Sequence, residues 1–209
     1  MHIYAFGSVC RGEVSPNSDV DLLALVEGTD RRFDPNIYSI YSYKRIEALW
    51  REGNPFAWHL SLEARMLFAS DRVDCLGSLG TPERYSNGLA DCEKFHRLFS
   101  ESQDSIKRSG ASVIFDLSTI FLSIRNIATC FSLSTGSNPD FSRKSALNLG
   151  SYSVPLPSIA FQTLERARML CTRGLGKIVS AQEATLAMSY SDEIDKWMSR
   201  LVEQVKSHE

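Results

Sequence analysis

Residues 7–22 carry the pattern from which the fold can be inferred: Gly-Ser-Val-Cys-Arg-Gly-Glu-Val-Ser-Pro-Asn-Ser-Asp-Val-Asp-Leu. A short apolar run, His2 to Phe6, precedes this stretch and predicts a β-strand that ends at Gly7. A second apolar run, Val20 to Val26, predicts another strand. The stretch therefore indicates two strands joined by a loop that begins with glycine.

The polar residues of this stretch suit a phosphate and a metal ion. A glycine lets the backbone approach a ligand closely, and the Ser8 hydroxyl and nearby N–H groups can hold phosphate oxygens. Arg11 adds a fixed positive charge to the same loop. Asp19 and Asp21 are two residues apart on the predicted strand, so both carboxylates point to one face. Neighbouring carboxylates repel unless a cation lies between them, and hard oxygen ligands favour Mg²⁺.

The combined pattern resembles the nucleotidyltransferase fold of the DNA polymerase beta superfamily. It consists of Gly-Ser with Arg-Gly shortly after, and then Asp-x-Asp, with ten residues between the serine and the first aspartate. The resemblance implies transfer of a nucleoside monophosphate from an NTP, with ATP as the expected donor, to an acceptor hydroxyl and release of pyrophosphate. It also implies a Mg²⁺ (or Mn²⁺) cofactor. The implied nucleotide-binding residues are Gly7, Ser8, Arg11 and Ser18, and the implied catalytic metal ligands are Asp19 and Asp21.

The same family uses a third carboxylate on a later strand. Apolar residues alternate from Phe56 to Leu62, which predicts a strand whose polar face carries His59, Ser61 and Glu63. In the kanamycin nucleotidyltransferase type the acid stands where this chain has Ser61. Glu63, an acid on the same face, is therefore expected to be the third catalytic and metal-binding residue.

Other candidates for the third ligand stay open. His59 is the second choice on the predicted strand, and Asp74 is a more remote one, because it lies near a predicted linker. Glu63 could instead be a carboxylate in the turn of a hairpin that continues into Met66–Phe68, and His59 could be a structural histidine.

The chain as a whole predicts an α+β fold, with a small mixed-sheet nucleotidyltransferase domain followed by an all-α helical bundle. The boundary is expected near the Gly- and Pro-containing segment 75–82, between domains spanning 1–80 and 83–209. In the first domain a helix is expected over 37–52, ended by Gly53-Asn54-Pro55. Helices in the second domain are expected over 83–108, 112–135, 156–172 and 181–206.

The expected helix over 112–135 carries a polar stripe on an apolar background. Asp116, Thr119, Ser123 and Asn126 follow helical spacing, so the stripe lines either a cleft or the contacts between buried helices. Ile124-Arg125-Asn126 and the segment 138–143 resemble the helical acceptor-binding domains joined to kanamycin-type nucleotidyltransferases. There a helical-domain acid acts as general base, a role for which Asp116 is the candidate.

Composition narrows the partners. The 209 residues have a net charge of -2, without the basic excess of proteins that bind nucleic acid through phosphates. The acceptor is therefore expected to be a small molecule or a protein; an RNA end, a third class that the superfamily resemblance leaves open, is less favoured because it does not suit this charge. No ribonuclease activity of the HEPN type is expected, because no histidine follows Arg125-Asn126 within a few residues. A homodimer is compatible with these data, as is a second interpretation, a catalytically inactive NTP-binding or interaction module such as an antitoxin-like or defence component.

The expected location is the cytoplasm. The five cysteines have long, irregular spacings, which favours reduced thiols over a disulfide framework or a zinc site. We see no basic leader and no stretch that approaches the roughly 18–20 apolar residues needed to span a bilayer, so neither a signal peptide nor a membrane partner is expected.

Overall fold

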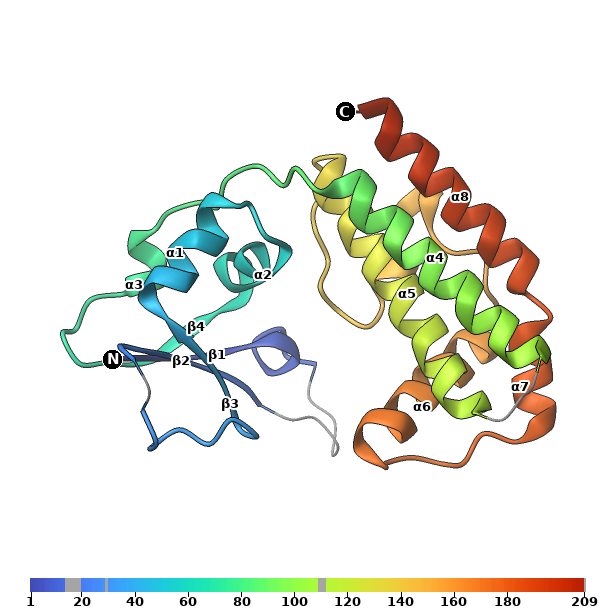
Figure 1. Ribbon diagram of the computed structural model, residues 1–209, viewed down its shortest axis with the longest axis horizontal. Coiled ribbons are helices and arrows are strands. Elements are labelled where there is room, and N and C mark those ends of the chain that lie inside the picture. Colours follow the sequence, from blue (N-terminus) through green and yellow to red (C-terminus); the bar gives the residue numbers. More distant parts are fainter. Residues whose placement is uncertain (14–19, 29, 109–111, 209) are drawn as a thin grey trace. The chain divides into compact units, whose positions relative to one another are not determined.

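The computed structural model describes residues 1–13, 20–28, 30–108 and 112–208. The chain divides into two compact units, Met1–Ser86 and Asn87–Glu209 (Figure 1). The first contains a mixed four-stranded sheet with helices, and the second is helical, so the expected α+β class with a following helical domain is confirmed. Ser18 and Asp19, two of the expected site residues, lie outside the described residues.

The sheet of the first unit is built around the two predicted strands. It consists of β1 (His2–Phe6), β2 (Asp21–Val26), β3 (Tyr38–Ser42) and β4 (Arg65–Ala69), in the order β3-β2-β1-β4. β1 is antiparallel to both of its neighbours, whereas β2 and β3 are parallel. The register pairs Phe6 with Asp21 and Ala5 with Arg65, so the starts of β2 and β4 flank the end of β1.

Helices cover one face of this sheet. α1 (Tyr43–Arg51) and α2 (Pro55–Glu63) contribute to a core whose strand residues include Tyr4, Phe6 and Leu23. On the other face, Phe33 packs with Ala24 and Val26 in a smaller cluster. Burial of these side chains is the main driving force that holds the helices on the sheet.

Of two secondary-structure predictions for this unit, one is confirmed only in part and the other is wrong. The expected helix over 37–52 is β3 followed by α1, which begins where the Ser42 side chain accepts a hydrogen bond from the Arg45 N–H. The expected strand over 56–62 is the helix α2. Its N-cap is Asn54, and Pro55 occupies the first turn, where a missing N–H costs nothing. The residues that end α1 thus also begin α2.

The segment expected as a linker belongs in part to the first unit. Residues Cys75–Ser78 form the short helix α3, capped by the Asp74 side chain, which accepts from the Gly77 N–H. Further along, the Trp50 indole donates to the Gly80 carbonyl oxygen, and the Trp58 indole donates to that of Glu83. These bonds hold the chain against α1 and α2 as far as Glu83.

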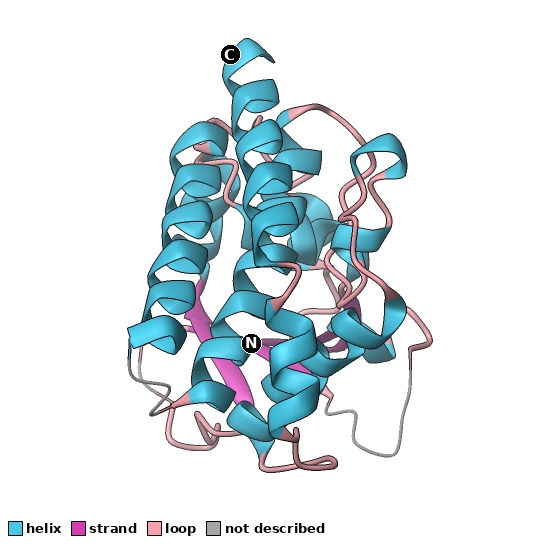
Figure 2. Cartoon of the chain, turned by 90° about the vertical axis from the view of Figure 1, so that its right-hand side faces the viewer, coloured by secondary structure: helices cyan, strands magenta, loops and turns pink. Residues whose placement is uncertain are grey.

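The second unit is a bundle of helices that run beside one another (Figure 2). Where one helix was expected over 181–206 the structure has two, α7 (Ala181–Met188) and α8 (Ser191–His208), separated at Ser189 and Tyr190. The helices are α4 (Gly88–Arg108), α5 (Val113–Ser134), α6 (Ser158–Arg173), α7 (Ala181–Met188) and α8 (Ser191–His208).

Helix α5 is the centre of this bundle. By length and composition alone it could cross a membrane, so the expectation that no segment has these properties is wrong for Val113–Ser134. However, 61% of its most apolar window is buried, and it packs against α4, α6 and α8. Such burial is typical of the core helix of a bundle, because a helix that is apolar on most sides must be covered.

Candidate functional site

The Gly-Ser pair lies directly after β1, as the sequence predicts. Gly7–Val9 forms a single 3₁₀ turn, and Gly7 has a φ of +75°, a conformation that glycine adopts without steric cost. The Gly7 carbonyl oxygen accepts from the Cys10 N–H at 3.1 Å, and the Ser8 carbonyl oxygen accepts from the Glu13 N–H at 2.9 Å. These bonds curl the chain over the end of β1, so that Ser8 and Arg11 lie in one compact turn.

Asp21 lies against this turn. It pairs with Phe6 in the sheet, and a Cβ atom added to Gly7 would collide with the Asp21 carboxylate. The Asp21 residue is nevertheless exposed. The absence of a side chain at Gly7 therefore makes room for a carboxylate at the mouth of the turn, where it is also open to solvent.

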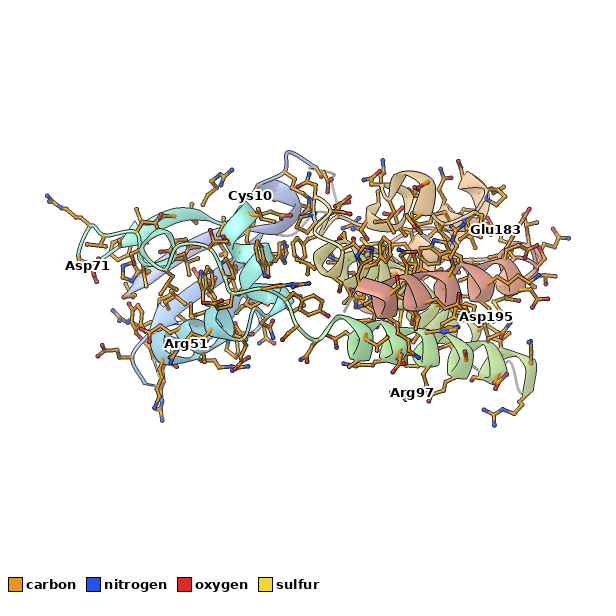
Figure 3. All side chains as sticks on the ribbon, turned by 90° about the horizontal axis from the view of Figure 1, so that it is seen from above. Cys10, Arg51, Asp71, Arg97, Glu183 and Asp195 are labelled. Atoms are coloured by element: carbon orange, nitrogen blue, oxygen red, sulfur yellow. The ribbon has the colours of Figure 1, made fainter. Side chains whose placement is uncertain are left out.

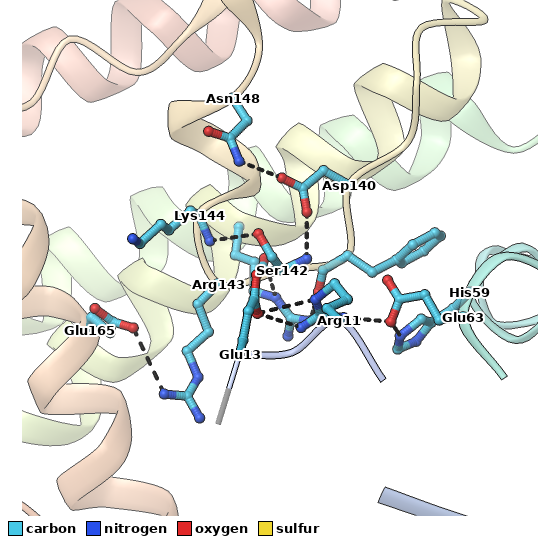
Figure 4. Close-up of polar contacts among 12 residues, drawn as sticks. Arg11, Glu13, His59, Glu63, Asp140, Ser142, Arg143, Lys144, Asn148 and Glu165 are labelled. Carbon is cyan, nitrogen blue, oxygen red and sulfur yellow. Dashed lines mark hydrogen bonds and ion pairs between the residues drawn. The ribbon is translucent and has the colours of Figure 1, made fainter. Parts of the chain in front are cut away.

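Arg11 is held by two carboxylates of the same unit (Figure 4). Its Nη1 donates to Glu63 Oε2 at 2.5 Å, and its Nε donates to Glu13 Oε2 at 3.1 Å. The His59 Nε2 lies 2.9 Å from the same Glu63 oxygen. The end of α2 is thereby connected to the turn through a chain of polar contacts.

Because α2 is a helix, its polar residues are arranged differently from those of the predicted strand. On a strand, His59, Ser61 and Glu63 would share one face, but on α2 His59 and Glu63 are one turn apart and Ser61 is exposed. The three residues therefore do not share the polar face that a strand would give them, although Glu63 does lie beside the turn. Asp74, the remote candidate, accepts from the Tyr4 hydroxyl at 2.9 Å and caps α3, which gives it a structural role.

Arg65 contributes a charge near the Gly7 turn that the sequence analysis did not predict. Burial raises the pKa of the Cys10 thiol, an effect opposed by Arg65 and Arg11 and reinforced by Glu63 and Asp21. Burial tends to lower the pKa of Arg11, but its bonds and charge interactions with Glu13 and Glu63 raise it overall. Arg65 reaches this site because it begins β4 opposite Ala5, a register that depends on tertiary pairing.

The site can be tested for its fit to a divalent cation. Among the residues that the structure describes, no group of three or more His, Cys, Asp or Glu side chains could hold a metal ion. Asp21 offers a solvent-accessible carboxylate in a space that a Cβ at Gly7 would fill. This fits Mg²⁺, which typically takes one or two carboxylates together with substrate phosphates.

A cavity of about 660 Å³ lies elsewhere in the first unit. Its lining includes His2, Tyr43 and Asp71. Figure 3 shows Asp71 and Cys10 at opposite ends of this unit. None of the residues of the Gly7 turn lines this cavity. We place the candidate site at the turn and not in the cavity because the turn carries the charged and polar residues that suit a phosphate and a cation.

The polar residues of α5 serve the packing of the second unit. Asp116 is buried and accepts from the Ser105 hydroxyl of α4 at 3.0 Å. Thr119 and Ser123 donate to backbone carbonyl oxygens one turn earlier in their own helix. These observations favour the second of the two interpretations of the stripe, contacts between buried helices.

Arg125 and the segment 138–145 form a second structural feature of that unit. The Arg125 guanidinium donates to the carbonyl oxygens of Phe141 and Ser142, at 2.7 and 3.3 Å. Asp140 accepts from the Ser142 N–H and from the Asn148 amide (Figure 4). The residues that resemble kanamycin-type helical domains therefore form a loop that is hydrogen-bonded to Arg125 of α5.

Comparison with known families points to the same part of the chain. Residues 2–76 match the family model described as a nucleotidyltransferase domain. The match includes the whole Gly7 turn, Asp21, His59 and Glu63. It supports a place for the first unit in the nucleotidyltransferase superfamily. A search of curated proteins gave no match to the chain.

Proposed function

We propose that this chain is a Mg²⁺-dependent nucleotidyltransferase that moves a nucleoside monophosphate from an NTP to an acceptor hydroxyl. The observation that carries the proposal is the close approach of the Asp21 carboxylate to Gly7, at a turn that also holds Ser8 and Arg11. A phosphate-binding turn beside an acidic residue suits phosphoryl transfer, in which positioning and charge neutralisation provide most of the catalysis. The match of residues 2–76 to nucleotidyltransferase domains supports the same reaction class.

Each residue of the turn has a role in this proposal. The Gly7 backbone, the Ser8 hydroxyl and the Arg11 guanidinium hold the phosphates of the NTP, and Ser18 contributes to the same binding. Asp21 and Asp19 hold the cation, which when bound neutralises charge on the phosphates. The acceptor oxygen forms a bond to the α-phosphorus while the bond from that phosphorus to the bridging oxygen breaks, and pyrophosphate leaves. The acceptor proton passes to a base or to water.

The acceptor in this proposal is a small molecule or a protein side chain. The net charge of -2 offers no general attraction for a nucleic acid backbone. A small-molecule acceptor such as an aminoglycoside accords with the kanamycin-type resemblance of the helical region, and a protein acceptor accords with antitoxin-type members of the superfamily.

The first prediction concerns the transfer reaction. Labelled ATP, GTP, CTP and UTP are incubated with the protein and Mg²⁺, and pyrophosphate release and label transfer are measured. Asp21→Ala, alone or together with Asp19→Ala, is expected to reduce transfer by about 100-fold or more, because lost electrostatic stabilisation of a transition state has effects of that order. The fold should be retained, since Asp21 is exposed.

The matched control for this experiment is Glu47→Ala, which removes an exposed carboxylate of α1. It is expected to retain wild-type transfer. Full transfer by the Asp21→Ala, Asp19→Ala double variant would refute the assignment of the site.

A second candidate function is NTP binding without transfer. It is favoured by the engagement of Glu63 with Arg11 and His59, because the third acid expected for catalysis is already paired. This function predicts that NTPs raise the melting temperature while none is consumed with any acceptor tested.

A further inference from the structure

The Arg11 guanidinium is fixed from two sides. Glu13, five residues after Ser8, contacts Nε at 3.1 Å and Nη2 at 3.0 Å, and Glu63 of α2 contacts Nη1. The Arg11 side chain is 20% exposed and that of Glu63 is 11% exposed, whereas Glu13 is 47% exposed. The pair with Glu63 is therefore the better shielded of the two and is less weakened by solvent.

Glu63 is itself held in place by the fold. Its Oε2 also contacts His59 Nε2, one turn earlier in the same helix. The His59 ring packs edge-on against Phe6 at 5.5 Å between centroids, and Phe6 is the residue immediately before Gly7. Helix α2 is thus attached both to the last residue of β1 and to the arginine of the following turn.

We propose that Glu63 is a positioning residue that orients Arg11 toward the phosphates of the NTP, and that Glu63 is not a ligand of the divalent cation. This inference rests on the proposed function. A guanidinium carries five N–H groups, of which three serve Glu13 and Glu63, so the capacity for bonds to phosphate oxygens remains. A cation placed on Glu63 would lie beside the positive charge of Arg11, and like charges a few Å apart repel.

The test measures binding of non-hydrolysable α,β-methylene ATP, GTP, CTP and UTP to the full chain by calorimetry. Each titration is made with EDTA and again with Mg²⁺ in excess. The variants are Arg11→Ala, Glu63→Ala, Glu63→Gln and the double variant Arg11→Ala, Glu63→Ala. The matched control is Glu52→Ala, which removes another Glu–Arg pair of the first unit, the exposed contact of Glu52 with Arg45 at 2.8 Å.

The expected result is a loss of metal-free affinity. Glu63→Ala should weaken nucleotide binding in EDTA roughly tenfold, as expected for one partly shielded charged hydrogen bond. Glu63→Gln keeps an oxygen that can accept from Arg11, so it should recover part of this loss. In the Arg11→Ala background, Glu63→Ala should change the affinity by less than about twofold, because the arginine it orients is already absent. Glu52→Ala should match the wild type.

The Mg²⁺ titration separates this role from metal binding. In this titration a hydrolysable NTP replaces the analogue. At saturating nucleotide, the Mg²⁺ concentration for half-maximal transfer should stay within about twofold of the wild type in Glu63→Gln. A large rise in that concentration, with metal-free binding unchanged, would make Glu63 a metal ligand and overturn the proposal. Additive effects of the two alanine substitutions would overturn it as well.

Failure of the proposed function would look different. If the wild type binds no nucleotide, with or without Mg²⁺, both proposals are refuted. If the wild type binds nucleotide and transfers it while Glu63→Ala and Glu63→Gln bind equally well in EDTA, only the positioning role is refuted. Thermal unfolding of each variant identifies any that fails to fold, and Glu63→Gln preserves the shape of the side chain for this reason.

Discussion

At the scale of single residues, Gly7 and Gly12 form a natural pair of test positions. Both have a φ of +75°, so an alanine at either position adopts a strained left-handed conformation. A Cβ at Gly7 would collide with the Asp21 carboxylate, whereas among the described residues, the chain neighbours apart, no atom lies within 4 Å of a Cβ at Gly12. Both substitutions therefore carry the same free-energy cost of a positive φ at alanine. Only the substitution at Gly7 also brings a Cβ atom against Asp21.

We predict that Gly12→Ala destabilises the protein by about 1–2 kcal/mol, the usual cost of the left-handed conformation. Gly7→Ala should cost more than this and should also abolish nucleotide binding, because the carboxylate and the turn cannot both keep their places. Urea denaturation and nucleotide titration measure the two effects. Equal losses of stability and of binding in the two variants would contradict the close packing of Asp21 on the turn.

At the scale of elements, helix α2 shows where pattern reasoning failed. Phe56, Trp58, Leu60 and Leu62 alternate like a strand, but the side chains buried in the helix are Ala57 and Leu60, three residues apart. Leu62 is exposed, and Trp58 satisfies its indole N–H on the Glu83 carbonyl oxygen. In a segment of nine residues, too few positions are available to distinguish the period of a strand, 2, from that of a helix, 3.6. Asn54 and Pro55, which are typical of the start of a helix, indicated the structure better.

Helix α7 provides a pH-dependent prediction. Its capping box has Ser180 accepting from the Glu183 N–H while Glu183 accepts from the Ser180 N–H, and Arg166 contacts Glu183 at 2.6 Å. The Ser180 N–H and then Arg166 lower the pKa of Glu183 from 4.5 to about 2. A carboxyl whose pKa is lower in the folded state than in the unfolded state stabilises the fold at any pH above its unfolded-state pKa. This stabilisation is lost as the pH falls through the folded-state pKa.

We therefore expect Glu183→Gln to lower the melting temperature at pH 7 and the difference from the wild type to shrink between pH 4.5 and about 2. Glu193→Gln, at an exposed position in the first turn of α8, serves as the control. Thermal unfolding followed by circular dichroism over this pH range measures both. A difference that stays constant down to pH 2 would mean that the charge of Glu183 does not support the cap.

At the scale of the whole molecule, each unit has its own core. Leu25 of β2 is fully buried in the core that the sheet forms with the helices of the first unit. Ile127 of α5 is fully buried in the second unit. Truncation of either side chain leaves a cavity and is expected to cost about 2–5 kcal/mol. Because Leu25 belongs to the core of the first unit and Ile127 to the central helix of the second, each substitution should act on one unit.

Calorimetry of Leu25→Ala and Ile127→Ala measures this independence. We predict two unfolding transitions in the wild type, with Leu25→Ala lowering the midpoint of one and Ile127→Ala lowering that of the other. Addition of an NTP should raise the transition that Leu25→Ala lowers, since ligand binding stabilises the unit that holds the ligand. A single transition lowered by both substitutions would show that the units unfold as one.

The sequence by itself determined the first two strands, the Gly7-Ser8 turn between them and the helical nature of the second unit. These features depend on local preferences, namely apolar runs, a glycine at positive φ and helical periodicity over many residues. Tertiary structure alone decided which charges meet at the turn. Glu63 reaches Arg11 because α2 packs on the sheet beside Phe6, and the charge of Arg65 acts on Cys10 because β4 pairs with β1 so that Arg65 lies opposite Ala5. Contacts between residues some fifty positions apart depend on how the elements pack, which no short pattern encodes.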